Sequence, residues 1–262
     1  MDTVSPSGQT KTINGMEMYY EIRGRGEPLL FISGFTGLGA DWDYVFKDPV
    51  DGFQLILPDP RGHGRSTNPS GAFTFRQSGL DVLALLDQLE INRLKAIGLS
   101  GGAETLLHVA TLQPDRLEAM VLVSGAPYFP EQARKIMLQA TVESHAEEEW
   151  AMMRRRHVHG DDQIRALWQH AHDFANSYDD VNFRPELLST IKARTLIVHG
   201  DRDPLYPAGL ALEMYTSIPR SYLWIIPNRG HGPIFGDDSP RFGEIALGFL
   251  KGEWEQKQTP AE

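Results

Sequence analysis

The sequence contains no cysteine, and this absence excludes several kinds of site. Without cysteine there is no disulfide framework, no thiolate nucleophile and no cysteine-ligated metal. A chain of this kind suits the cytoplasm, and we predict a cytoplasmic location. Residues 1–6 also lack the basic start and the apolar centre that a secretory signal peptide would have.

Long apolar runs are missing as well. The longest, such as residues 82–86 and 222–226, reach only five residues, whereas a membrane-spanning helix needs about 20. We therefore expect no membrane span. The chain has 262 residues, 41% of them hydrophobic, which suits one α/β domain with a sizeable core and an inserted part.

Positive charge is scarce. The formal net charge is −10, and the only basic run is Arg154-Arg155-Arg156. Such a surface repels phosphate backbones, so nucleic acid is not an expected partner. A small neutral or apolar molecule is the expected partner, and the sequence leaves the oligomeric state open.

The remaining pattern alternates short apolar segments with helical ones. Residues 12–13 and 16–20 flank Asn14-Gly15, a dipeptide typical of a tight hairpin turn. A helix is expected at 74–90, with Thr74 as its N-cap and Gln77 completing a capping box. Such alternation predicts an α/β fold with a mostly parallel, twisted sheet flanked by helices. Later strands are expected at 28–33, 53–57, 94–99, 117–123, 195–199 and 222–226.

The alternation stops between residues 128 and 191, which are polar and show helical spacing without strand signals. We interpret this stretch as a helical cap inserted into a core formed by residues 1–127 and 192–252. Residues 253–262 are expected to be a flexible tail.

The strongest chemical signal is a G-x-S-x-G pattern centred on Ser100, from Gly98 to Gly102, between a predicted strand and a helix. A serine on such a tight turn has a strained backbone, and small residues two positions away relieve the crowding. The N–H groups of the following helix would favour a developing oxyanion. The pattern predicts Ser100 as a nucleophile.

Two further loops supply the partners that a nucleophilic serine needs. Asp203 follows the strand at 195–199, and His231 follows the strand at 222–226. The carboxyl ends of parallel strands gather at one edge of a sheet, so these side chains are expected to meet Ser100 there. The sequence predicts His231 as base and an aspartate of the loop after the strand at 195–199 as the acid that orients it. Position alone does not separate Asp203 from Asp201 on that loop.

With these motifs in the order Ser, Asp, His, the chain resembles the α/β-hydrolase fold family over nearly its whole length. Residues 59–66 (DPRGHGRS) resemble the family's turn after the fourth strand, and 34–37 (GFTG) its oxyanion loop. The resemblance implies that Phe35 and Gly101 supply the oxyanion-hole amides. It also implies that Asp203 is the acid, because residues 200–207 match the family's G-x-x-D-x-x-x-P pattern. Asp201 is then expected to bond nearby backbone groups. Many relatives have histidine where this chain has Ser33.

Three aromatic residues are candidates for lining the substrate pocket: Trp42, Tyr128 and Trp168. Packing of the insertion onto the sheet explains most other aromatic residues equally well. Among the remaining histidines, His157 and His159 lie two positions apart, and scattered histidines on a solvated helical face explain this pair better than a metal site. The glycines at 34–39 lack dinucleotide-binding spacing. We expect neither a metal nor a cofactor.

Together these features predict a serine hydrolase that cleaves a small carboxylic ester or lactone through an acyl-enzyme. The same triad also serves carbon–carbon bond hydrolases and cofactor-free perhydrolases, and the sequence does not separate them. A small-molecule receptor with slow residual hydrolysis is a third alternative, from a different functional class. The substrate's identity and chain length depend on the folded shape of the insertion.

Overall fold

The computed structural model describes residues 8–46 and 50–254. In this part of the chain, eight strands form one sheet in the order β1-β2-β4-β3-β5-β6-β7-β8. The first two strands and the β2–β4 pair are antiparallel, and all later neighbours are parallel. This topology confirms the predicted fold class. The strands are β1 (Gln9–Ile13), β2 (Met16–Gly24), β3 (Glu27–Ile32), β4 (Phe53–Pro58), β5 (Leu94–Leu99), β6 (Leu117–Val123), β7 (Arg194–Gly200) and β8 (Ser221–Ile226).

The predicted hairpin joins β1 to β2. Asn14 and Gly15 both have positive φ, 46° and 77°, as a two-residue turn of this kind requires. Asn and Gly tolerate these values better than other residues, which is why the dipeptide identified the turn from the sequence.

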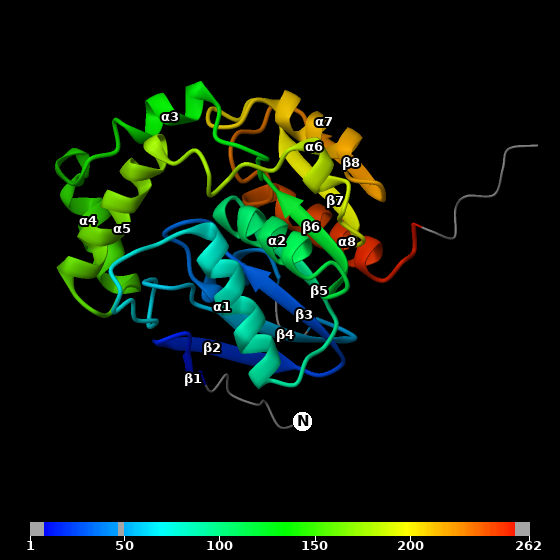
Figure 1. Ribbon diagram of the computed structural model, residues 1–262, viewed down its shortest axis with the longest axis horizontal. Helices are drawn as coiled ribbons and strands as arrows, with labels where there is room; N and C mark the ends of the chain where they lie inside the picture. Colours follow the sequence, from blue (N-terminus) through cyan, green and yellow to red (C-terminus); the bar gives the residue numbers. More distant parts are fainter. Residues whose placement is uncertain (1–7, 47–49, 255–262) are drawn as a thin grey trace, which may run out of the picture.

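Both faces of the sheet are covered (Figure 1). Alternate residues of a strand point to opposite faces. In β3, Leu30 and Ile32 face the cluster containing α1 (Phe75–Gln88), α2 (Gly101–Leu112) and α7 (Ala208–Ser217). Leu29 and Phe31 face η1 (Gly39–Tyr44) and α8 (Ser239–Leu250). Burial on both faces explains why the central strands are apolar throughout.

Helix α1 begins as expected, but its first turn differs in one detail. The Thr74 hydroxyl accepts the Gln77 N–H at 2.9 Å, which confirms Thr74 as the N-cap. The predicted capping box is wrong, because the Gln77 side chain donates to Asp81 one turn further along the helix instead.

Between β6 and β7 the chain forms only helices and loops, as the polar pattern indicates. We call residues 128–191 the insertion; its helices up to residue 173 lie beyond the carboxyl ends of the central strands, whereas its last helix lies beside α7 (Figure 1). A bridge pairs Tyr128, at its start, with Asn182. Treating it as a separate cap stays a prediction. Its elements are α3 (Glu131–Met137), η2 (Val142–Ser144), α4 (Glu147–Arg156), α5 (Asp161–Asp173), η3 (Phe174–Asn176) and α6 (Pro185–Leu188).

The last described residue is better packed than the sequence suggests. Trp254, assigned to a flexible tail, contacts the rings of Tyr222 and Phe249 edge-on. The rest of that predicted tail, 255–262, lies outside the described residues. Among the described helices, none is long and apolar enough to span a bilayer. The cytoplasmic location stays a prediction.

Candidate active site

Ser100 lies at the sharp turn between β5 and α2. Its backbone has φ of 50° and ψ of −119°, a strained conformation for a residue with a side chain. A Cβ on Gly98 would lie 2.4 Å from the Gly102 carbonyl oxygen, and one on Gly102 would lie 2.2 Å from that of Ile32. Steric crowding therefore requires both glycines, as the pattern predicts.

A chain of hydrogen bonds joins Ser100 to the two other predicted residues. His231 Nε2 lies 2.8 Å from Ser100 Oγ, and His231 Nδ1 lies 2.8 Å from Asp203 Oδ2. An ionised carboxylate can only accept, so Nδ1 carries the proton and Nε2 is free to accept the serine proton. The geometry suits removal of that proton by the imidazole.

Asp203 is well held for the role of orienting acid. Burial disfavours its charge, but the hydrogen bond from His231 and those from the Tyr206 and Leu205 amides outweigh this and lower its pKa. The carboxylate is therefore ionised at neutral pH. Asp201, by contrast, accepts a long bond from the Arg229 amide, at 3.4 Å, and lies 3.7 Å from the Arg202 guanidinium. Within the described residues it makes no contact with His231.

A second histidine lies behind the acid. His199 is fully buried, its Nε2 donates to the Tyr206 carbonyl at 2.7 Å, and burial lowers its pKa. The same nitrogen is 3.7 Å from Asp203 Oδ2. A neutral His199 therefore packs against the carboxylate without competing with His231 for it.

The two predicted oxyanion amides lie close to each other. A Cβ on Gly101 would come within 3.2 Å of the Phe35 amide nitrogen. Gly101 is the first residue of α2, where amide groups have no partner inside the helix. The Phe35 N–H donates to no acceptor within the described residues. Two free donors beside Ser100 can stabilise a tetrahedral oxyanion.

Ser33 occupies the position of the family's histidine. Its hydroxyl donates to the Leu38 carbonyl through a short hydrogen bond inside its own loop. The bond that a histidine would make to a neighbouring loop is therefore not made by this side chain.

A cavity of about 500 Å³ opens above the triad, between the sheet and the insertion. Trp168 lines it and stacks on His145 with ring centroids 3.9 Å apart. Tyr128 was a wrong prediction: its side chain lies outside this cavity and its hydroxyl donates to Glu213 of α7. The other lining side chains are mostly apolar, among them Phe75, Phe129, Met137, Met153, Phe174, Leu205 and Phe235.

Trp42 is also placed differently from the prediction. It packs in the core against Phe31 and Phe46 and is only 3% exposed. It borders a smaller hollow of about 330 Å³, which shares Phe35 and Met153 with the cavity of the triad but does not contain Ser100.

Phe129 and Tyr206 also line the cavity, and the sequence did not indicate them. Phe129 is the second residue of the insertion, next to Tyr128. Tyr206 lies three positions after Asp203 on the loop after β7. Its place beside the predicted acid was the sequence feature that could have indicated it as a cavity residue. Within the described residues, no group of three or more histidine and acidic side chains could hold a metal.

Comparison with known proteins agrees with this geometry. Residues 27–150 match a family model described as the alpha/beta hydrolase fold. The chain is 27% identical to the mouse protein named Serine hydrolase BPHL, over 84% of this chain and 78% of that protein. The chain has the α/β-hydrolase fold.

Solved structures of an esterase and of a lactonase match the fold of most of the chain. An esterase from Exiguobacterium antarcticum matches with a TM-score of 0.78 and 21% identity, covering 94% of this chain and all of that one. An enol-lactonase from Burkholderia xenovorans LB400 matches with a TM-score of 0.73 and 22% identity, covering 93% and 100%. At these identities the likeness extends to the fold alone.

Proposed function

We propose that this α/β-hydrolase cleaves a small carboxylic ester or lactone through an acyl-enzyme, with Ser100 as nucleophile. The observation that carries the proposal is the continuous chain of hydrogen bonds from Asp203 through His231 to Ser100, beneath an apolar cavity. The mouse relative, whose name describes a serine hydrolase, supports the reaction class.

Each residue has a defined step. His231 Nε2 takes the proton from Ser100 Oγ while that oxygen attacks the substrate carbonyl. The amides of Phe35 and Gly101 hold the resulting oxyanion, and Asp203 stabilises the imidazolium. His231 then gives its proton to the leaving alcohol. Water, activated by the same imidazole, releases the acid and regenerates Ser100.

The cavity favours a neutral substrate. Its described lining residues include Glu149 but neither lysine nor arginine. A buried carboxylate on the substrate would lack a cationic partner there, which is costly in an apolar site. This composition supports an ester or lactone over the anionic dienoate substrates of carbon–carbon bond hydrolases.

A serine-directed fluorophosphonate tests the nucleophile. We expect stoichiometric labelling at Ser100 by peptide mass analysis, and loss of ester turnover by roughly 10³ to 10⁶ in Ser100→Ala with an unchanged melting curve. Ser144→Ala, which changes an exposed serine of the insertion, is the control. Labelling at another residue would overturn the proposal. Turnover far beyond one equivalent separates an enzyme from a receptor with residual hydrolysis.

A further inference from the structure

The oxyanion loop, residues 33–37, has an unfavourable backbone at its centre. Thr36 has φ of 65°, in a region that β-branched residues rarely adopt. Such a conformation persists only where the surroundings hold it. On one side, the Gly34 carbonyl accepts the Gly37 N–H at 2.8 Å. A trans peptide directs its C=O and N–H oppositely, so this bond also orients the Phe35 N–H.

The other side of Phe35 is held from outside the loop. The Thr36 N–H donates to His63 Nε2 at 3.0 Å, and His63 Nδ1 lies 2.8 Å from the Arg61 carbonyl oxygen. Because an amide nitrogen can only donate, Nε2 must accept and Nδ1 must carry the proton. The rings of Phe35 and His63 also pack edge-on, with centroids 4.9 Å apart.

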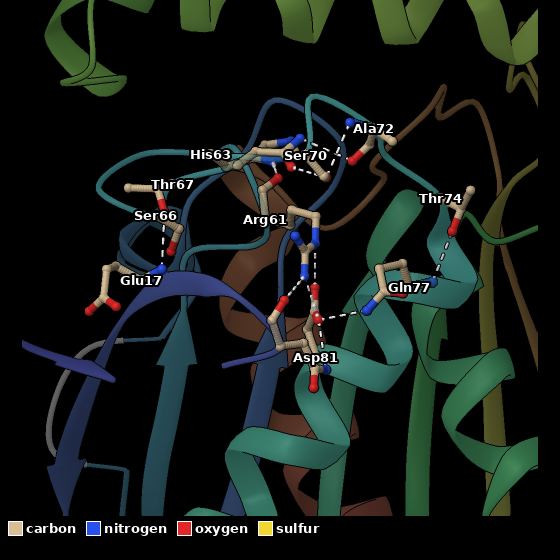
Figure 2. A network of polar contacts seen from close by, with 12 residues as sticks. Glu17, Arg61, His63, Ser66, Thr67, Ser70, Ala72, Thr74, Gln77 and Asp81 are labelled. Atoms are coloured by element: carbon tan, nitrogen blue, oxygen red, sulfur yellow. Dashed lines mark hydrogen bonds and ion pairs between the residues drawn. The ribbon is translucent and has the colours of Figure 1, made fainter. Parts of the chain in front are cut away.

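His63 is in turn anchored to the body of the protein. Its side chain is buried, and burial lowers its pKa to about 3, so the ring stays neutral at ordinary pH. Arg61 forms a buried two-bond ion pair with Asp81 of α1, at 2.7 and 2.8 Å. Gln77 donates to the same carboxylate (Figure 2). A continuous set of contacts therefore connects helix α1 to the oxyanion loop.

We propose that His63 is a positioning residue for the oxyanion hole and supplies, from the loop at 59–66, the support that Ser33 does not. The proposal rests on the proposed function. His63 does not line the cavity over Ser100 within the described residues, so it acts only through the Phe35–Thr36 peptide.

The test compares two substitutions. His63→Phe keeps the ring packing but removes both hydrogen bonds. We expect kcat to fall about 10- to 100-fold, which is less than the ~10² to 10³-fold loss in kcat caused by removing one oxyanion donor completely. His63→Gln retains an acceptor, and we expect a smaller loss of about 3- to 10-fold, because Gln can still accept from an amide. KM should stay near the wild-type value in both variants, since ground-state binding does not use the oxyanion amides.

A trifluoromethyl ketone, which forms a tetrahedral oxyanion with a nucleophilic serine, gives the decisive readout. Its inhibition constant should rise in parallel with the loss in kcat/KM, while the pH–rate profile keeps its shape. His108→Phe is the matched control: this buried histidine of α2 bonds the Asp180 carbonyl, away from the oxyanion loop. It should affect melting temperature without changing the inhibition constant.

Three results would overturn the proposal: unchanged kcat and inhibition constant in His63→Gln and His63→Phe, a change confined to KM, or an equal loss in His108→Phe. If His63→Phe does not fold, the inhibition constant of His63→Gln decides alone. Failure of the proposed function is a separate result, seen as labelling of wild type elsewhere than at Ser100.

Discussion

Asp203 and His231 are 28 positions apart in the chain, yet Asp203 Oδ2 lies 2.8 Å from His231 Nδ1. They meet because β7 and β8 are parallel neighbours, so the loops after both strands leave the sheet at the same edge. The contact selects one imidazole tautomer and leaves Nε2 facing Ser100.

The first prediction distinguishes the two aspartates of that loop. Asp203→Asn should cut kcat by up to ~10⁴, because an amide donates to the imidazole and favours the wrong tautomer. Asp201→Asn should leave kcat close to wild type, since its carboxylate contacts the Arg229 amide and the Arg202 side chain rather than the imidazole. Steady-state kinetics with melting curves for both variants check this. An inactive Asp201→Asn variant together with an active Asp203→Asn variant would reverse the assignment of the triad acid.

The second prediction concerns stability in acid. Burial lowers the pKa of His63 to about 3 and that of His157 to about 4. The unfolded chain, with histidine pKa values near 6.5, therefore binds protons first as the pH falls. Each histidine should lower the free energy of unfolding by up to about 1.4 kcal/mol per pH unit, from about pH 6.5 down to about pH 4.

Urea unfolding between pH 7 and pH 4.5 measures this slope. In the folded state His157 Nδ1 accepts the Gly64 N–H, which requires the neutral ring. His157→Gln should flatten the pH dependence, whereas His159→Gln, at an exposed position of the same segment, should keep it. Equal slopes in wild type and His157→Gln would contradict the prediction.

The third prediction concerns a buried carboxyl beneath the site. Burial raises the pKa of Glu104 well above its ordinary value, while its Oε1 accepts the Ala126 N–H at 2.9 Å. The folded state thus retains a proton that the unfolded chain loses. Stability from this group is present below about pH 4.3, the ordinary Glu pKa, and is lost as the pH rises toward the folded pKa.

An amide at this position keeps the acceptor and cannot ionise. The free energy of unfolding of Glu104→Gln should therefore increase relative to that of wild type by up to about 1.4 kcal/mol per pH unit above about pH 4.3. Unfolding curves at pH 5 and pH 8 measure the difference, with the exposed Glu143→Gln as control. A difference that does not depend on pH would show that Glu104 ionises normally in the folded protein.

The fourth prediction concerns the acyl chain. Ala171 of α5 lines the cavity over Ser100. Ala171→Phe should lower kcat/KM for octanoyl esters by about tenfold or more, because each methylene that loses its place in an apolar pocket costs ~1 to 3 kcal/mol. Acetyl esters should be little affected. Tyr128→Phe, outside the cavity, should leave the whole chain-length series unchanged.

Local patterns in the sequence predicted most of the strands and the candidate nucleophile. Asn14-Gly15 predicts its turn because those residues tolerate positive φ. Gly98 and Gly102 predict the turn at Ser100 because no larger residue fits beside it. Such constraints act within a few bonds of the residue concerned, so the amino-acid sequence carries them without knowledge of the rest of the fold.

Only the tertiary structure decided which side chains surround the cavity. Tyr128 and Phe129 are neighbours, but the chain turns one toward α7 and the other toward Ser100. His63 reaches the oxyanion loop from 27 positions away. These contacts depend on how distant segments pack on the sheet. The folded backbone sets the direction of each side chain and therefore its partners, and the spacing of residues in the sequence does not encode that direction across loops.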